Sequence, residues 1–350
     1  MEGTRSADGF DDSLPDADLV EAGAWVPGPY GQGDERGSFR EVTPVKTARA
    51  LAILDASRSV YTYDLSEQLF EDFPAWGGRT FQQRLHCFGY PPPSDFEGTS
   101  TSVQPVGKNR LSVNEERVEL TYNMGTKING LAHCGVGTMY YNGYRADDIA
   151  GPRGLRHLGN HLAGPIVTRG VLLDVIGMKF ATGDTDDYFV VNGTKPVLRS
   201  NYRITIEDLQ AAEEFAQLSS PIEAGDVILI RTGWRELIHT QPRRYIEDLP
   251  PGPYLREARY LAKLRPALIG IDVWVFGVID PEIERGAHAA CHQELFMRHG
   301  IRIGEAIRSD PLAADGVYEF VFCAYPTNVV GAVAGNSPPF ALGQPKARGL

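Results

Sequence analysis

The sequence predicts an α/β protein with one domain built around a mixed β-sheet. Three runs of apolar and β-branched residues, at 164–177, 224–234 and 266–278, have the composition of strands that are buried on both faces. An amphipathic helix at 205–218 lies between the first two runs. Because strands and helices do not alternate strictly along the rest of the chain, the pattern favours a mixed sheet.

The N-terminal region predicts a tail followed by the start of the folded domain. Residues 1–24 are acidic and lack an apolar run, so we expect a flexible tail before a single domain at 25–350. A helix is expected over 43–57, with Thr43 as its N-cap and a proline at the first helical position. The segment 59–66 is rich in aromatic and β-branched residues, which is typical of a strand.

The remaining elements follow from local patterns of the same kind. Pro and Gly clusters predict loops at 73–79 and 89–98. Thr205 and Asp208 have the spacing of a capping box at the start of the 205–218 helix. Further elements are expected in this order: a strand at 116–125, a helix at 292–300, a turn into a strand at 300–307, and two strands within 316–335.

The composition is that of a globular protein and excludes several kinds of partner. Hydrophobic residues make up 42% of the chain and charged residues 23%, which is enough apolar surface for a sizeable core. The net charge of −11 and the lack of a Lys/Arg-rich block exclude nucleic acid and anionic membranes as electrostatic partners. No run approaches the roughly 20 apolar residues of a membrane span, and the chain starts without a targeting signal, so we expect a cytoplasmic protein.

Several familiar catalytic motifs are missing from the sequence. It contains no GxxxxGK[ST], GxSxG, HExxH or GxGxxG pattern, so phosphoryl-transfer, serine-hydrolase and dinucleotide chemistry have no support. The four cysteines form no CxxC pair and are expected to be free thiols in a reducing compartment: Cys87, Cys134, Cys291 and Cys323.

A glycine-rich segment at 125–143 is the first candidate for a functional site. It combines five glycines with Lys127, Asn129, His133 and Asn142. Glycines at this density let a backbone turn closely around a small ligand, and long loops are often binding loops. The alternative is a surface loop with one incidental histidine.

Two further segments carry residues that suit catalysis or binding. His288 and His292 are one helical turn apart and can share one face of a helix, as metal-binding histidines do, although a solvated pair is the commoner case. In the Pro-Gly loop, Phe73, Trp76 and Arg79 combine two aromatic rings with a cation, which suits a flat, partly anionic ligand. A surface arginine is the alternative for Arg79.

Taken together, these segments resemble the cyclase family, whose best-known type is the bacterial kynurenine formamidase. The resemblance runs from about Tyr30 to Pro339 and includes GDERGSFREVTP, YDLS, GPIVTRGVLLDV, AGDVILIRTGW, GIDVW, HQELFMRHGIRIGE and GVYEFVF in that order. It implies a swivelling β/β/α architecture in one domain, and a homo-oligomer, either a dimer or a tetramer.

The metal motif of that family reads His-x-Gly-Thr-His-x-Asp-x-x-x-His, and this sequence has NMGTKINGLAH in its place. The final histidine, which acts in proton transfer in the family, matches His133. The three ligand positions upstream hold Asn123, Lys127 and Asn129 instead of His, His (or Gln) and Asp.

The resemblance also carries over two downstream residues. His292 and Glu305 match a metal-binding His and Glu of the family. At about 4 Å and an effective dielectric constant near 20, a protonated Lys127 would oppose each unit of metal charge by about 4 kcal/mol. A positive charge there can instead polarise a carbonyl group or stabilise an oxyanion.

These observations lead to three hypotheses about function. The first is an enzyme that acts on a small carbonyl compound by cyclisation, dehydration or ring opening of a lactone or amide, without metal. The second is a metal-dependent amide or ester hydrolase with one Zn or Mn ion on His133, His292 and Glu305. The third is a non-catalytic binding protein for a small molecule.

The first hypothesis assigns a role to each candidate residue. The catalytic residues are His133, Lys127, His292 and Glu305, and no residue binds a metal. The residues expected to bind the substrate are Arg79, Trp76, Phe73, Asn129 and Asn142.

Overall fold

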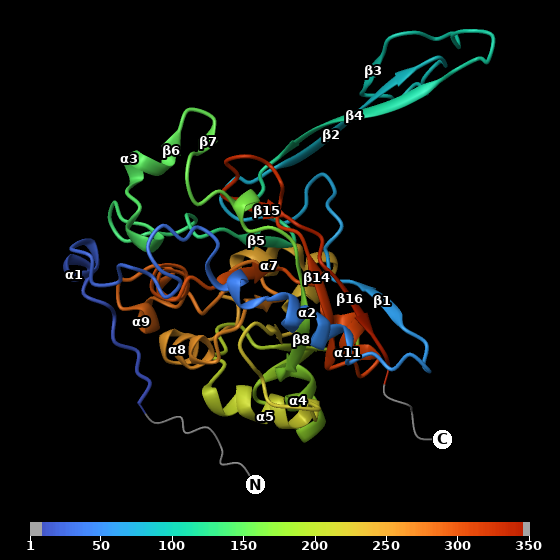
Figure 1. Cartoon of the computed structure of the whole chain (residues 1–350). Coiled ribbons are helices and arrows are strands. Elements are labelled where there is room, and N and C mark those ends of the chain that lie inside the picture. The colour runs from blue at the N-terminus through green and yellow to red at the C-terminus, as the bar shows by residue number, and fades with distance from the viewer. Residues whose placement is uncertain (1–8, 346–350) are drawn as a thin grey trace.

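The computed structural model describes residues 9–345, and a nine-stranded mixed β-sheet forms its centre (Figure 1). In sheet order the strands are β1 (Tyr61–Asp64), β16 (Phe340–Gly343), β14 (Glu319–Ala324), β8 (Ile166–Asp174), β11 (Val227–Arg231), β12 (Leu268–Ile271), β13 (Arg302–Glu305), β5 (Lys127–Asn129) and β15 (Ala334–Asn336). β8, β11, β12 and β13 are parallel, and every other pairing in the sheet is antiparallel.

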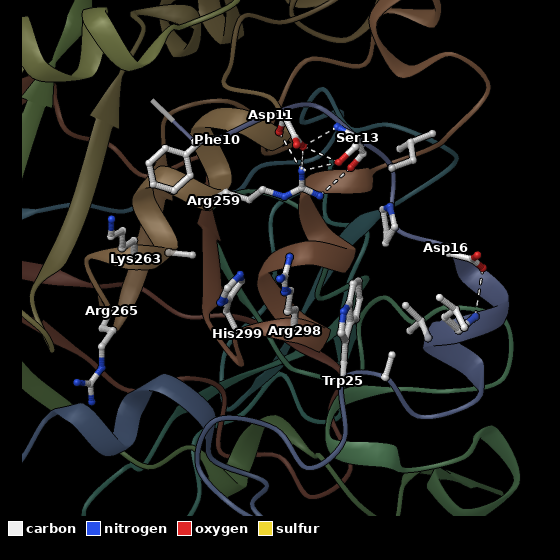
Figure 2. A pocket seen from close by; sticks show the side chains of 17 residues that line it. Phe10, Asp11, Ser13, Asp16, Trp25, Arg259, Lys263, Arg265, Arg298 and His299 are labelled. Atoms are coloured by element: carbon white, nitrogen blue, oxygen red, sulfur yellow. Dashed lines mark hydrogen bonds and ion pairs between the residues drawn. The ribbon is translucent and has the colours of Figure 1, made fainter. Parts of the chain in front are cut away.

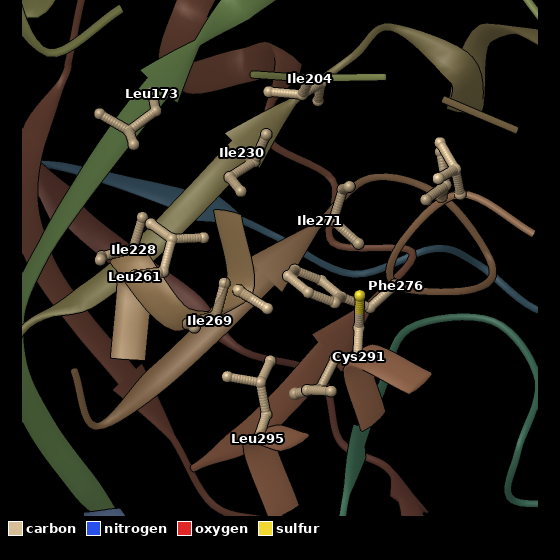
Figure 3. Packing of buried hydrophobic residues seen from close by; sticks show 14 of the residues in the cluster. Leu173, Ile204, Ile228, Ile230, Leu261, Ile269, Ile271, Phe276, Cys291 and Leu295 are labelled. Atoms are coloured by element: carbon tan, nitrogen blue, oxygen red, sulfur yellow. The ribbon is translucent and has the colours of Figure 1, made fainter. Parts of the chain in front are cut away.

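Alternation along the central strands separates two hydrophobic cores. Ile228 and Ile230 of β11 belong to the larger core, whereas Val227 and Leu229 belong to the smaller one. Successive side chains of a strand point to opposite faces, so the two cores lie on the two faces of the sheet. Figure 3 shows the larger core, where apolar side chains from β11 and β12 pack with Leu295. Each such buried side chain contributes about 1.5–3 kcal/mol relative to an exposed one.

Helices and short helical turns fill the connections between the strands. α2 contacts β8 and β14, and α5 contacts β8. The α-helices are α1 (Ala17–Glu21), α2 (Pro44–Leu51), α3 (Ala146–Ile149), α4 (Val175–Thr182), α5 (Ile206–Ala216), α6 (Leu237–Thr240), α7 (Pro242–Glu247), α8 (Leu255–Lys263), α9 (Pro281–Glu284), α10 (Ala290–Gln293) and α11 (Asp310–Ala314). The shorter turns are η1 (Gly37–Glu41), η2 (Tyr141–Gly143), η3 (Asn160–Leu162), η4 (Trp234–Glu236) and the π-helical turn η5 (Glu294–Arg298). None of the helices in residues 9–345 has the length and apolar character of a membrane span.

The α/β fold with a mixed sheet is confirmed, and so are most of the predicted elements. The three apolar runs form β8, β11 and β12, and the Thr43 side chain caps α2. The capping box of α5 is present in both directions between Thr205 and Asp208. The glycine-rich segment 125–143, expected as a loop, begins with the buried strand β5 because its first residues pair with β13 and β15.

A three-stranded arm projects from the body of the molecule (Figure 1). It consists of β2 (Phe81–Phe88), β3 (Thr99–Ser100) and β4 (Val113–Leu120), and β4 starts and ends earlier than the strand expected at 116–125. Only its base, Phe81 and Leu120, packs against the larger core. Along the arm, Leu85 and Val118 are 37% and 45% exposed. Two further hairpins are smaller: β6 (Ala150–Gly151) with β7 (Gly154–Leu155), and β9 (Tyr188–Val191) with β10 (Lys195–Leu198).

Residues 9–24 pack against the folded domain in the structure, and the flexibility expected for this range stays a prediction (Figure 2). The carboxylate of Asp11 lies 2.6 Å from Arg259 of α8, and Val20 of α1 is buried. The acidic composition that indicates a tail is instead complementary to arginines on the domain, and one apolar side chain anchors the segment. Residues 1–8 of the expected tail lie outside the described residues.

Candidate active site

The three segments singled out in the sequence meet at one cavity of about 400 Å³. It lies where β12 and β13 end, which is the edge where ligands bind in many α/β sheets. Its walls come from the loop before the arm, β5, the loop after β12, α9, α10 and the end of β13. The lining residues are Trp76, Arg79, Asn123, Lys127, His133, Cys134, Trp274, Val275, Ile279, Glu284, His288, Ala289, His292 and Glu305.

The carboxylate of Glu305 is the centre of a hydrogen-bond cluster at the floor of the cavity. Its Oε1 accepts from the backbone N–H of Phe276 at 2.7 Å and lies 3.0 Å from His292 Nε2. Its Oε2 accepts from Asn129 Nδ2 at 2.8 Å and from the Lys127 ammonium at 2.9 Å. Burial acts to raise the pKa of Glu305, but Lys127 and His292 outweigh it and hold that pKa well below its usual range.

Lys127 reaches Glu305 because the two residues face each other across β5 and β13. Its ammonium also donates to the backbone carbonyl of Trp274 at 2.9 Å. Two of its three N–H groups therefore have acceptors among the described residues, and the third is available to a ligand. Burial lowers the pKa of Lys127, and the Glu305 carboxylate opposes that shift.

His292 is held in a defined orientation by its bond to Glu305. A carboxylate only accepts hydrogen bonds, so His292 Nε2 carries the hydrogen of that contact. The other ring nitrogen, Nδ1, is buried and has no hydrogen-bond partner in residues 9–345. His292 belongs to α10, which continues into the π-helical turn η5, a distortion that is frequent at functional sites.

His133 stands beside His292 on the cavity wall. The two ring centroids are 6.1 Å apart, and His133 Nε2 lies 3.4 Å from the Asn123 side-chain amide. Burial lowers the pKa of His133 to about 4, and the neighbouring His292 and Lys127 act in the same direction. His133 is therefore a neutral imidazole at pH 7 and can accept a proton.

Two tryptophans and an arginine form the mouth of the cavity. The rings of Trp76 and Trp274 are stacked with centroids 6.2 Å apart and an interplanar angle of 10°. The Arg79 guanidinium lies 5.4 Å from the centre of the Trp76 ring. Within residues 9–345 Arg79 makes no ion pair, so its charge is free to meet a ligand.

Three of the residues expected to bind the substrate occupy other places. Asn129 lies beneath the cavity, where it supports Glu305. Phe73 belongs to the larger core and packs against Phe70 instead of lining the cavity. Asn142 holds the backbone of an N-terminal loop through Gly28 N, Gly31 O and Asp34 O, so it is a structural residue.

The structure adds cavity residues that the sequence did not indicate. Glu284 is 4% exposed, burial raises its pKa, and its Oε1 has no partner among the described residues. A lone glutamate at a short helix end carries no sequence signal of such a role. Cys134 also lines the cavity, but burial raises the pKa of its thiol to about 12, which excludes a thiolate nucleophile at neutral pH.

A larger cavity of about 820 Å³ lies under the N-terminal segment (Figure 2). It is lined by several cations, but most are already neutralised: Arg259 pairs with Asp11 and Glu294, and Arg298 also pairs with Glu294. It holds none of the clustered acid–base groups of the smaller cavity. The 400 Å³ cavity is therefore the candidate active site.

Titratable side chains gathered in one cavity of a mixed α/β fold are typical of an enzyme active site. The family model described as "Putative cyclase" matches residues 63–278, which is more than half of the chain. The protein belongs to the cyclase family, and the family resemblance seen in the sequence is confirmed.

Solved structures show the same fold at low sequence identity. A crystal structure described as a novel cyclase has a TM-score of 0.71 and 21% identity, covering 90% of this chain and 98% of that chain. Isatin hydrolase A from Ralstonia solanacearum has a TM-score of 0.55 and 16% identity, with coverage of 86% and 97%. An isatin hydrolase bound to the product analogue thioisatinate has a TM-score of 0.55 and 15% identity, with coverage of 87% and 100%. No curated protein matches the sequence.

The residues at the cavity floor do not offer a free ligand set to a divalent ion. Both oxygens of Glu305 already accept two hydrogen bonds each, and one donor is the Lys127 ammonium. The Nε2 atom of His292 is engaged by Glu305 as well. Over residues 9–345, no group of three or more His, Cys, Asp or Glu side chains is arranged to hold a metal ion.

Proposed function

We propose that this cyclase-family member is an enzyme that opens the ring of a small cyclic amide or ester, by acid–base and electrostatic catalysis without a metal ion. The observation that carries the proposal is the Lys127–Glu305–His292 cluster on the cavity floor, with the neutral His133 beside it. The isatin hydrolases that share the fold give a precedent for this substrate class.

Each step of the proposed reaction falls to a residue of the cavity. His133 takes a proton from a water molecule as the water oxygen attacks the ring carbonyl carbon. The free N–H of Lys127 donates to the carbonyl oxygen as negative charge develops there. The ring C–N or C–O bond then breaks, and His133 returns the proton to the leaving nitrogen or oxygen.

Lys127 suits this role because its position is fixed before the substrate arrives. Glu305 and the Trp274 carbonyl hold two of its N–H groups at 2.9 Å each. A donor held in this way loses little freedom during the reaction, which is why preorganised donors contribute so much to catalysis. The buried surroundings of the cluster lower the effective dielectric constant and strengthen its interaction with an oxyanion.

The metal-free part of the proposal rests on the donors that surround Glu305. Binding a metal to Glu305 and His292 would require the loss of the Lys127 and His292 contacts and would place two cations side by side. The competing hypothesis, a single Zn or Mn ion on His133, His292 and Glu305, requires Lys127 to turn away from Glu305.

The test is a turnover assay with a panel of cyclic amides and lactones, with isatin as the first probe. We expect hydrolysis that is unchanged after extensive chelator treatment, with less than about 0.1 equivalents of Zn or Mn by elemental analysis. Activity that is lost to the chelator and restored by Zn or Mn would establish the metal-dependent hydrolase instead. Tight binding of panel compounds without any turnover would establish a binding protein.

A further inference from the structure

The geometry of the cavity mouth points to a more specific substrate class. We propose that the cavity selects planar ring compounds that carry a carboxylate beside an N–H or O–H donor. Arg79 would bind the carboxylate, the faces of Trp76 and Trp274 would contact the ring, and Glu284 would accept the donor. This inference rests on the proposed function in placing the substrate in this cavity, but it concerns recognition and not the chemical step.

The case for a carboxylate begins with Arg79. The nearby Arg84 has a carboxylate partner, Glu71. Arg79 has none within the described residues, although burial at the cavity wall lowers its pKa and so costs its charge some solvation. A guanidinium that is half-buried and unpaired matches the two oxygens of a carboxylate, which it binds through two parallel N–H donors.

The placement of charges at the cavity agrees with an anionic ligand. Lys127 on the floor is paired with Glu305 at 2.9 Å. Arg79 at the mouth has no carboxylate within ion-pair distance among residues 9–345. An incoming carboxylate therefore meets an unpaired cation at the mouth.

The planar ring follows from the aromatic surfaces at the mouth. Trp76 is 54% exposed, and its ring is nearly parallel to that of Trp274. Because Arg79 lies over the Trp76 ring, a ligand carboxylate on Arg79 would bring its attached ring against the tryptophans.

Buried acceptor atoms without partners in the cavity wall indicate that the ligand carries a hydrogen-bond donor. Glu284 Oε1 and His292 Nδ1 are both buried without a hydrogen-bond partner in residues 9–345, and their side chains are 4% and 3% exposed. Buried polar atoms without partners are unfavourable, so a ligand that supplies an N–H or O–H group gains from satisfying them. A carboxylate alone cannot do so, because it carries no hydrogen at pH 7.

The experiment measures binding by isothermal titration calorimetry with three planar probes. 2-Aminobenzoate carries the carboxylate and the N–H donor, benzoate lacks the donor, and 2-aminobenzamide lacks the charge. We expect 2-aminobenzoate to bind about tenfold more tightly than 2-aminobenzamide and about threefold more tightly than benzoate. Failure of 2-aminobenzoate to bind at millimolar concentration, or equal affinity for the amide, would overturn the inference.

Two matched arginine variants test whether Arg79 binds the carboxylate of the ligand. Arg79→Gln should weaken 2-aminobenzoate binding about tenfold and leave 2-aminobenzamide binding within about twofold. Arg84→Gln removes the same charge from the nearby arm, outside the cavity, and should leave both affinities unchanged. If both variants weaken binding equally, the loss comes from long-range electrostatics and not from a contact with Arg79, and the inference fails.

The outcomes separate this inference from the proposed function. Carboxylate selectivity that depends on Arg79 in a protein without turnover would support the inference and defeat the proposed function. Turnover of uncharged lactones with the same KM in wild type and Arg79→Gln, together with no carboxylate preference in binding, would defeat the inference and leave the proposed function intact.

Discussion

The Lys127 ammonium and the Glu305 carboxylate lie 2.9 Å apart and face each other across neighbouring antiparallel strands, and each side chain is only 2% exposed. Two strands of the central sheet thus place a buried ion pair on the cavity floor. The pair is surrounded by further donors and acceptors, which is the condition under which a buried ion pair is tolerated.

Removing one partner of this pair should destabilise the fold. Lys127→Met leaves the Glu305 charge buried without its cation, so the free energy of unfolding should fall by about 3–5 kcal/mol. The measurement is chemical denaturation at pH 7. Lys195→Met is the matched control: Lys195 is exposed and lies 3.9 Å from Glu236, so its loss should cost less than about 1 kcal/mol. A loss as small as that control would mean that the pair is not buried in solution.

Replacing the proton-transfer residue should lower the rate and spare the fold. His133→Ala should reduce kcat by about two to four orders of magnitude, because general base catalysis typically contributes that much. Circular dichroism and the melting temperature should stay close to wild type. His86→Ala, on the exposed arm, provides the control and should keep full activity. Turnover within threefold of wild type would remove His133 from the mechanism.

The pH dependence of kcat/KM should report the pKa of His133. Burial lowers that pKa to about 4, and the neutral imidazole is the active form. Activity should therefore be level from pH 8 down to about 5 and fall as the pH passes through about 4. The residual activity of His133→Ala should lack that inflection. If kcat/KM instead falls with a midpoint near pH 6.5, the imidazole of His133 is in contact with water and its pKa is not lowered.

Acid should also reduce stability through the same cluster. The pKa of His133 is lowered in the folded state, so the unfolded chain takes up the proton first and stability falls between about pH 6.5 and 4. The pKa of Glu305 is held below its usual range, so its contribution is present at neutral pH and is lost as the pH falls further. Denaturation curves from pH 7 to 4 should show steadily lower midpoints, with a smaller decrease for His133→Ala.

Restoring two ligand types should change the affinity for metal. Wild-type protein is expected to bind Zn or Mn weakly at the cavity, whereas Lys127→His with Asn129→Asp removes the opposing ammonium and adds an imidazole and a carboxylate. Calorimetric titration should show a new site of near-unit stoichiometry in the double variant. The single change Lys127→Met separates removal of the charge from addition of ligands. Equal metal binding by wild type and the double variant would contradict the assigned role of Lys127.

The sequence predicted the sheet better than the arm because the two depend on different signals. β8, β11 and β12 are buried on both faces, and their continuous apolar runs are easy to recognise. β2 reads FQQRLHCF and is largely exposed, so its polar composition hides a strand that is stabilised by pairing with β4.

In the candidate site too, the sequence predicted the position of some residues and not of others. Lys127, His133, His292 and Glu305 meet at one cavity, because β5 and β13 carry Lys127 and Glu305, α10 carries His292, and His133 follows shortly after β5. Asn142 does not line the cavity, because its side chain holds the loop that contains Gly28 and Asp34, a role that local sequence does not reveal. The expected dimer or tetramer stays a prediction that light scattering can test.

The arm has a further consequence for how this cavity can change over evolution. At the base of the arm, the Thr121 N–H donates to the Thr80 carbonyl at 3.0 Å. This hydrogen bond holds together the loop that carries Arg79 and the segment that carries Asn123, both of which line the cavity. β2 and β4 pair residue by residue from Phe81 opposite Leu120 outward. If β2 and β4 are shortened or lengthened by the same even number of residues, each remaining side chain stays on the same face of the arm. The hydrogen bond between Thr121 and Thr80 is also kept. The length of the arm can therefore change during evolution without altering the cavity residues next to its base.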